Sequence, residues 1–240
     1  MAFRDIVPAA GTLDPTGIAE LTGGGDVLVL APHPDDETLG CGGAISAAVA
    51  AGTRVHVVIV TNGARSHPNS AAFPPARIAA LRAAEATRAV AILTAGAERP
   101  IFLGYPDCAA PSDAAGAARV ADRLSDVLRA TTAVWTTWEG DPHVDHESTA
   151  RLATRLCRGA GARHLAFPVW GRVGGEAPCP DRDRLIRFAT APHRPAKAQA
   201  LAAHRSQMTR MIDDDPEGFL FPEELARHFI ASDEIFIRVP

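Results

Sequence analysis

An apolar run that ends in a group of polar side chains constrains the fold of this chain more than any other feature. Residues 27–31 are continuously apolar, which is typical of a strand covered on both faces of its sheet. The small-residue segment 39–51 and the β-branched run 55–61 follow, so the chain opens as strand, helix and strand. Two strands joined by a helix form a parallel pair with a right-handed crossover, and this pattern favours an α/β fold.

The same alternation continues along the rest of the chain. Helices are expected at the segments 15–21, 75–93, 114–129, 146–157 and 196–211. Further strands are expected at 101–103, 133–138, 165–170, 185–189 and 234–239. We predict one α/β domain over residues 1–240, with a leader segment at 1–24. It is a Rossmann-like three-layer sandwich with a mostly parallel sheet, and its closely spaced last strands leave room for an antiparallel edge.

The composition is that of an ordinary globular protein, and it narrows the classes of partner. Hydrophobic residues make up 47% of the 240 residues and charged residues 22%, so a large core needs no disulfides. A formal net charge of -4 provides no basic surface for nucleic acid. No apolar run approaches the roughly 18 residues of a membrane span. The N-terminus does not resemble a signal peptide, which favours a cytoplasmic location. The oligomeric state is left open, a homo-oligomer being one alternative.

A histidine and three carboxylates follow the first strand directly. His33 and Asp36 are three residues apart where the strand turns into a helix, and this spacing can direct both side chains to one point. Open α/β sheets build their sites at the carboxyl ends of strands. Acidic residues are also common at helix starts because they interact favourably with the helix dipole. Asp35, Asp36 and Glu37 alone therefore do not establish a site.

A second cluster, Asp-Pro-His-Val-Asp-His-Glu at 141–147, follows the run 133–138 and contains His143, Asp145 and His146. His146 can supply a third ligand beside His33 and Asp36. Two histidines and one carboxylate leave a fourth position open, as catalytic zinc sites do. The same ligand set also binds Fe(II), so the residues do not fix the metal. The presence of two such clusters, each after a strand, predicts one metal site closed by the fold.

These clusters resemble the signatures of the LmbE/PIG-L family of zinc-dependent N-deacetylases. Ala-Pro-His-Pro-Asp-Asp-Glu at 31–37, followed by Gly-Cys-Gly-Gly at 40–43, resembles the first signature, and His-Val-Asp-His at 143–146 resembles the second. Weaker similarities lie at Arg-Ala-Ala-Glu (82–85), Leu-Gly-Tyr-Pro-Asp (103–107) and the segment from Lys197 to His-Arg-Ser-Gln (204–207). Together they span about residues 27–207.

The resemblance implies a Rossmann-like sheet, a single Zn²⁺ and hydrolysis of an acetamide, usually on an N-acetylglucosamine-type sugar. The partner would then be a small N-acetylated sugar or its conjugate. By motif position, the metal ligands would be His33, Asp36 and His146. Asp35 would be the general base. His143 would stabilise the tetrahedral intermediate or protonate the departing amine, with Asp145 supporting it.

Four further residues are candidates for substrate binding: Arg65, Arg77, Asn62 and Trp138. The two arginines flank the irregular segment 62–74, and Asn62 follows the second strand. Trp138 ends a strand and can stack on a sugar face. A solvated arginine and a packed tryptophan are the alternatives for these positions.

Two other groups of charged residues are expected to be structural. Arg82 and Glu85 are one helical turn apart, which predicts an ion pair. Asp213, Asp214 and Asp215 predict a solvated acidic turn.

Two other functions stay open at this point. One is an amidase that acts on another N-acyl substrate, and the other is a non-catalytic Rossmann-type module that binds a nucleotide or a sugar. Carboxylates at the N-terminus of a helix argue against a nucleotide, because they would repel the pyrophosphate that binds there.

Overall fold

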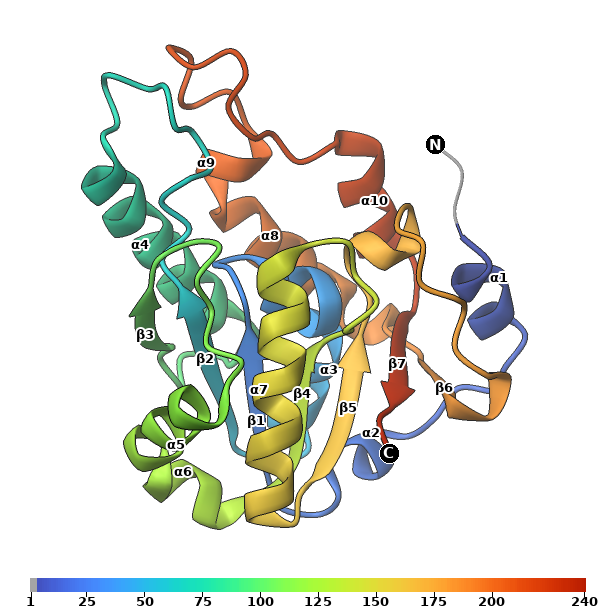
Figure 1. Ribbon diagram of the computed structural model, residues 1–240. Coiled ribbons are helices and arrows are strands. Elements are labelled where there is room, and N and C mark those ends of the chain that lie inside the picture. The colour runs from blue at the N-terminus through green and yellow to red at the C-terminus, as the bar shows by residue number, and fades with distance from the viewer. Residues whose placement is uncertain (1–3) are drawn as a thin grey trace.

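A seven-stranded sheet forms the centre of the protein (Figure 1). The computed structural model describes residues 4–240. The strands are β1 (Asp26–Ala31), β2 (Val55–Thr61), β3 (Ile101–Tyr105), β4 (Thr131–Thr137), β5 (Arg163–Phe167), β6 (Leu185–Phe188) and β7 (Glu234–Arg238). Their order in the sheet is β3-β2-β1-β4-β5-β7-β6. The first five strands are parallel, and β7 is antiparallel to both β5 and β6. The predicted α/β class, with a mostly parallel sheet and an antiparallel edge region, is confirmed.

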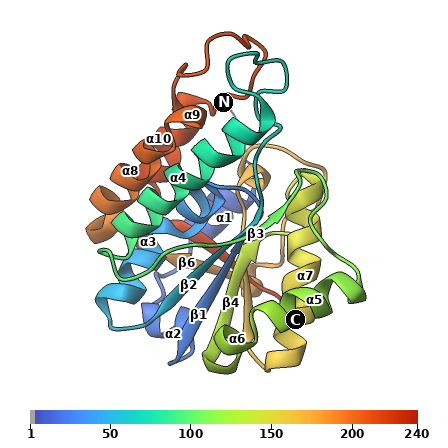
Figure 2. The ribbon, with the colours of Figure 1, turned by 90° about the vertical axis from the view of Figure 1, so that its left-hand side faces the viewer.

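Helices cover both faces of the sheet (Figure 2). One face carries α2 (Ile18–Thr22), α3 (Asp36–Ala50), α4 (Pro75–Leu93), α8 (Arg194–Ala203), α9 (Arg205–Met208) and α10 (Glu223–Ala231). The other face carries α5 (Ala114–Arg123), α6 (Ser125–Ala130) and α7 (Val144–Ala160). Successive residues of β1 point to opposite layers, so Val29 packs into one core and Leu30 into the other. This double burial explains the continuous apolar run.

The position of β1 brings the two sequence clusters together. β1 lies between β2 and β4, and Leu30 is paired with both Val58 and Thr136. The carboxyl ends of β1 and β4 therefore open at the same edge of the sheet. The helix that follows β1 packs close to the sheet because of Gly40, where a Cβ atom would lie 2.0 Å from the Phe167 ring. The sequence around Asp36 thus serves packing as well as the site.

Several helix boundaries differ from the sequence prediction. The helix expected over 114–129 is interrupted at Leu124, whose ψ of 13° falls outside the helical range. The helix expected over 196–211 ends before His204, whose ring lies 3.3 Å from the Glu37 carboxylate. Helix α10 was not predicted, although Pro222 at its start and the buried pair Leu225 and Phe229 are typical helix signals.

The described part of the N-terminal segment packs against the sheet. Helix α1 (Ile6–Gly11) buries Ile6 and Ala10 against residues of β6 and β7. None of the helices in the range 4–240 is long and apolar enough to cross a membrane.

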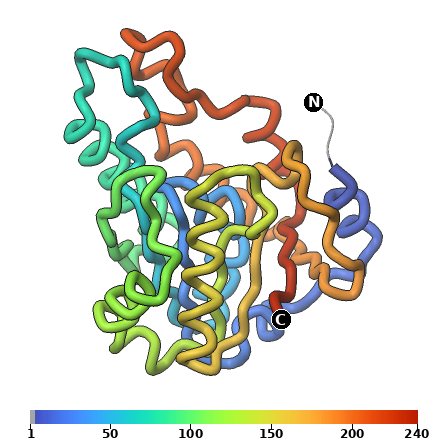
Figure 3. The backbone as a smooth tube through the Cα atoms, in the orientation of Figure 1, coloured from blue at the N-terminus to red at the C-terminus, as the bar shows by residue number. Residues whose placement is uncertain are grey.

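Two long loops, 62–74 and 209–222, run side by side above the carboxyl ends of the strands (Figure 3). Asp214 accepts hydrogen bonds from Ser70 Oγ at 2.7 Å and from the Ala72 backbone N–H at 2.8 Å. Asp215 accepts one from the Asn69 backbone N–H at 2.9 Å. The predicted solvated acidic turn holds for Asp213 and Asp214, which are exposed, but not for Asp215, which is buried. Asp214 and Asp215 also tie the two loops together.

Candidate metal centre

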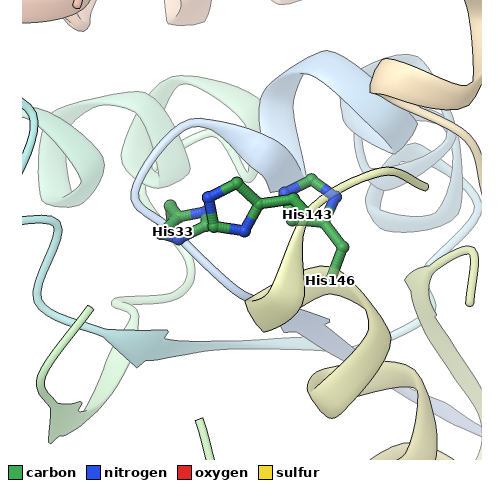
Figure 4. Close-up of side chains that lie close together, drawn as sticks. All are labelled: His33, His143 and His146. Carbon is green, nitrogen blue, oxygen red and sulfur yellow. The ribbon is translucent and has the colours of Figure 1, made fainter. Parts of the chain in front are cut away.

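The two sequence clusters meet in a cavity of about 340 Å³ at the carboxyl edge of the sheet. His33 follows β1, Asp36 begins α3, and His146 lies in the first turn of α7. Figure 4 shows the rings of His33, His143 and His146 grouped together, although His33 is more than 100 residues away in the sequence. One ring nitrogen from each of these three histidines lies within 4.8 Å of the corresponding nitrogens of the other two.

One carboxylate oxygen of Asp36 joins the expected ligands. Asp36 Oδ2 lies 3.1 Å from His33 Nδ1 and 3.3 Å from His146 Nε2. It also accepts the His33 backbone N–H at 3.0 Å. The fold therefore brings the three residues expected to bind metal into contact, and their role as ligands stays a prediction.

The far nitrogen of each histidine is held by another aspartate. Asp141 Oδ2 lies 2.9 Å from His146 Nδ1, and Asp145 Oδ2 lies 3.0 Å from His33 Nε2. Each carboxylate accepts a hydrogen bond from the N–H at the far nitrogen of its histidine. In the neutral ring this leaves the near nitrogens, His33 Nδ1 and His146 Nε2, with the lone pair. Carboxylate-held histidines of this kind are common around bound metals.

The near nitrogens face Asp36 in an arrangement that requires a positive charge. His146 Nε2 is buried and has no hydrogen-bond partner. An unprotonated nitrogen would repel the oxygen of Asp36, so either a proton or a metal ion must lie between them. Burial lowers the pKa of His146, but the charge of Asp36 and the hydrogen bond to Asp141 outweigh it and raise the pKa to about 10. Two histidine nitrogens and one carboxylate oxygen that face one another in this way fit a metal cation.

A second group of potential ligand atoms, from His33, Asp107 and Asp145, is less suited to a cation. The Asp107 carboxylate accepts the backbone N–H groups of Gly63 and Arg65, both at 2.8 Å. The Asp145 carboxylate likewise accepts backbone N–H groups, in addition to its contact with His33. These oxygens already have their partners, so we take the group around Asp36 as the candidate metal centre.

Asp141 belongs to the second sequence cluster, but the sequence did not predict its role at this centre. Its carboxylate also accepts the backbone N–H groups of Val169 at 2.9 Å and Gly171 at 2.7 Å, which fixes its position. In the sequence, Asp141 stands between Gly140 and Pro142, where an aspartate is also common in a simple turn. The sequence therefore carries no signal that separates the two roles.

We expect Asp141→Asn to weaken metal binding by about 10- to 100-fold, the usual cost of losing such a partner. Asparagine has a single acceptor oxygen and no charge, so it cannot accept from both His146 Nδ1 and the Gly171 backbone N–H, and it holds the Nδ1–H tautomer of His146 less strongly. A titration against a competing chelator measures the dissociation constant. Unchanged affinity in a folded Asp141→Asn protein would show that this hydrogen bond does not prepare the ligand.

Asp35 is the neighbour of Asp36 in the sequence, but its hydrogen-bond partners are not residues of the candidate metal centre. Its backbone φ is 136°, an unusual value for a residue other than glycine. Arg82 Nη2 donates to Asp35 Oδ2 at 3.0 Å, and the Asp35 backbone N–H donates to Glu37 at 3.0 Å. Burial raises the pKa of Asp35 to about 6, although the charge of Arg82 opposes the shift. A buried carboxylate that can exchange a proton near neutral pH therefore lines the cavity.

The predicted ion pair between Arg82 and Glu85 is wrong. Both side chains turn from α4 into the interior, where Arg82 binds Asp35. Glu85 accepts hydrogen bonds from the backbone N–H and the hydroxyl of Ser206, at 2.8 and 2.6 Å. Arg82 thus connects α4 to the start of α3, and Glu85 connects α4 to α9.

The structure also corrects the expected support of His143 by Asp145. His143 is the N-cap of α7, and its Nδ1 accepts the Asp145 backbone N–H at 3.2 Å. The Asp145 carboxylate turns inward to His33 instead. Burial and the neighbouring charges of His33 and His146 lower the pKa of His143 to about 4. His143 is therefore neutral at pH 7, with its proton on Nε2.

Only one of the four substrate-binding candidates lines the cavity. Arg65 is exposed at its rim. Arg77 stacks on Phe73 at 4.1 Å and bonds a backbone carbonyl, and Asn62 accepts a backbone N–H within its own turn. Trp138 packs against the core cluster beside β6 and β7. These last three side chains do not line the cavity and are engaged in local structure.

A known protein family matches the region that contains both clusters. Residues 28–157 match the family model PIG-L, described as GlcNAc-PI de-N-acetylase. The matched residues include both sequence clusters. No curated protein matches the chain.

Solved structures share the fold at low sequence identity. N,N'-diacetylchitobiose deacetylase from Pyrococcus horikoshii has 19% identity and a TM-score of 0.66, covering 93% of this chain and 87% of that chain. A triple mutant of a deacetylase of the teicoplanin biosynthetic pathway has 19% identity and a TM-score of 0.63, covering 89% and 98%. The 4-carboxy-2-hydroxymuconate hydratase of Pseudomonas putida KT2440 has 21% identity and a TM-score of 0.63, covering 85% and 82%. The fold is thus common to proteins with different reactions.

Proposed function

Because this chain belongs to the PIG-L family, we propose that it is a metal-dependent N-deacetylase that removes the acetyl group from a small amino sugar or its conjugate. The observation that carries this proposal is the pair of histidine nitrogens that converge on one oxygen of Asp36, each with its far nitrogen held by another aspartate. That arrangement prepares lone pairs for a cation. The net charge of -4 also supports a small substrate over a nucleic acid.

His33, Asp36 and His146 would hold the metal. We propose zinc, although Fe(II) accepts the same ligand set. A bound metal ion would polarise the acetamide carbonyl and lower the pKa of water. A cytoplasmic location and a homo-oligomer stay predictions.

Asp35 would act as the general base. Its carboxylate lines the cavity beside Asp36 and has a pKa of about 6, close to the range in which a base works at neutral pH. Arg82 and Glu37 hold its carboxylate and its backbone, so the group need not reorganise during the reaction. Asp35 would take a proton from the attacking water and later give it to the departing amine, which balances the protons of the hydrolysis.

His143 would stabilise the tetrahedral oxyanion. Sequence reasoning left two roles open for this residue, and its hydrogen bond to the Asp145 backbone favours this one. Because Nδ1 accepts that bond, the neutral ring carries its proton on Nε2 and can donate it in a hydrogen bond. A neutral donor suits an oxyanion, whereas a pKa of about 4 makes a poor proton source for an amine at pH 7.

We expect His143→Ala to lower kcat by about 100- to 1000-fold, the usual cost of a lost oxyanion donor. KM should change little, because the donor acts mainly in the transition state. His143→Gln, which keeps an N–H donor, is the matched control and should recover part of the rate. Metal content is measured on both variants: wild-type kcat in the alanine variant would remove the role, and lost metal would make His143 a ligand instead.

Acetate release tests the proposed activity against its alternatives. The metal-loaded protein is given a panel of N-acetylated amino sugars and, in parallel, other N-acylated amines. We expect acetate and a free amine from the sugars. Hydrolysis only of the other amines would make the protein a different amidase. No hydrolysis, together with binding of a nucleotide or sugar, would indicate a non-catalytic module.

A further inference from the structure

One wall of the cavity is aromatic. It is formed by Trp170, which follows β5, and by Phe219 and Phe221 from the loop 209–222; we call these three the aromatic corner. The rings of Trp170 and Phe219 are 5.9 Å apart and nearly perpendicular, at 86°. Those of Trp170 and Phe221 are 5.4 Å apart at 44°. The rings therefore meet at angles and offer no single flat platform.

Hydrogen bonds hold the backbone that carries two rings of the aromatic corner. The Phe219 backbone N–H donates to the Ser66 carbonyl at 2.7 Å, and the Phe221 backbone N–H donates to the Gln207 carbonyl at 2.8 Å. The bonds of Asp214 and Asp215 to the loop 62–74 hold the same segment at a second place. A wall that is already ordered loses little entropy on binding, so its contacts contribute fully to affinity.

Hydrolysis of an acetamide does not need these rings. The residues proposed for the reaction follow β1 or lie at the starts of α3 and α7, and none of them belongs to the aromatic corner. The acetyl methyl group is too small to cover three aromatic side chains. Sugar hydroxyls require polar partners, and a sugar ring stacks best on one open aromatic face. Perpendicular rings instead enclose an apolar group from two sides, and Leu39 adds a further apolar side chain to the lining.

We propose that the substrate carries an alkyl or aryl group close to its scissile amide, and that Trp170 and Phe219 determine specificity by enclosing it. This inference rests on the deacetylase function proposed above. The apolar group has two chemical sources, a substituent at the anomeric carbon of the sugar or an N-acyl chain longer than acetyl. Both present the same surface to the aromatic corner.

Four substrates separate these sources. The reference is the methyl β-glycoside of N-acetylglucosamine; the hexyl and phenyl β-glycosides extend the anomeric side, and the methyl glycoside of N-hexanoylglucosamine extends the acyl side. We expect one of the two extensions to raise kcat/KM by about tenfold or more, within the range for apolar groups in a fitted pocket. Trp170→Ala and Phe219→Ala should remove most of this gain, measured in each variant as the ratio of kcat/KM for the extended substrate to kcat/KM for the reference substrate.

Phe73→Ala is the matched control. Phe73 belongs to the neighbouring loop 62–74 and stacks on Arg77 outside the cavity, so its loss should leave the gain intact. Two results would overturn the inference: equal kcat/KM for all four substrates, or a gain that survives in both the Trp170 and the Phe219 variants.

Binding of compounds without a scissile amide separates this inference from the proposed function. Calorimetry compares methyl β-glucoside with phenyl β-glucoside and with the methyl glycoside of N-hexylglucosamine. Tighter binding of either apolar compound, lost in Trp170→Ala, supports the aromatic corner even if no acetate is released, in which case the deacetylase proposal alone fails. If neither apolar compound binds more tightly than methyl β-glucoside, the inference is overturned whatever the activity.

Discussion

Asp36→Ala should abolish metal binding and, with it, acetate release. Asp36 Oδ2 is the point on which His33 Nδ1 and His146 Nε2 converge, at 3.1 and 3.3 Å. Without this oxygen the centre loses its only anionic ligand, and the two histidines have no partner that fixes their near nitrogens. The loss of affinity should exceed the roughly 10- to 100-fold that removal of an outer partner causes. Metal analysis after reconstitution with zinc measures the effect.

Asp213→Ala is the control for this experiment. Asp213 is an exposed aspartate of the loop 209–222 and lies outside the cavity, so its loss should leave metal content and activity at the wild-type level. Circular dichroism of both variants reports the fold. Normal metal content in a folded Asp36→Ala protein would show that the ion binds elsewhere, for instance at the group formed by His33, Asp107 and Asp145.

Asp35→Asn should retain the metal and lose turnover by about 100- to 10,000-fold, the range for a general base. Asparagine is nearly isosteric and can still accept the hydrogen bond of Arg82, but it cannot take a proton from water. The backbone at this position, with φ of 136°, tolerates asparagine better than most residues. Steady-state kinetics and metal analysis are carried out on the same preparation. A low rate with normal metal content indicates loss of the general base, whereas a low rate with low metal content indicates loss of the metal site.

The matched change Asp213→Asn should have no effect on rate. Asp35→Asn removes the negative charge beside buried Arg82, so its melting temperature is recorded with the kinetics. Loss of metal in Asp35→Asn, together with retention in Asp36→Ala, would exchange the roles of the two aspartates. A rate near that of the wild type would remove Asp35 from the mechanism.

The main residues of the site were predictable because they lie at the carboxyl ends of two adjacent strands, β1 and β4. Each cluster follows an apolar run, and parallel strands carry sites at their carboxyl ends. The neighbouring positions of β1 and β4 depend on the order of strands in the sheet, which local patterns do not encode. The resemblance to a known family supplied that link.

The roles of individual side chains were less predictable because they depend on directions set by tertiary structure. Asp145 was expected to support His143, two residues away, but in the first turn of α7 its carboxylate turns inward to His33. Arg82 was expected to pair with Glu85 on the same helix, but it reaches a carboxylate 47 residues away. In both cases the residue nearest in the sequence is not the partner in the structure, because the buried side chain contacts a residue that is distant in the sequence.

The aromatic corner illustrates a third limit. Phe219 and Phe221 come from a segment with no regular pattern, and Trp170 was expected only as the last residue of a strand. An aromatic residue in such a position is equally consistent with the core or with a surface loop. Only the hydrogen bonds between the loops 62–74 and 209–222 place Phe219 at the cavity. Residues that determine specificity are therefore harder to infer than those that carry the reaction.

Acetate release with and without metal tests the central claim most directly. The protein is stripped with a chelator, one half is reconstituted with zinc, and both halves are incubated with the methyl β-glycoside of N-acetylglucosamine and its apolar derivatives. A metal-dependent N-deacetylase releases acetate and free amine in equal amounts only from the reconstituted half. Equal release from the stripped half, or no release from any N-acetyl sugar by protein that has bound zinc, would contradict the account.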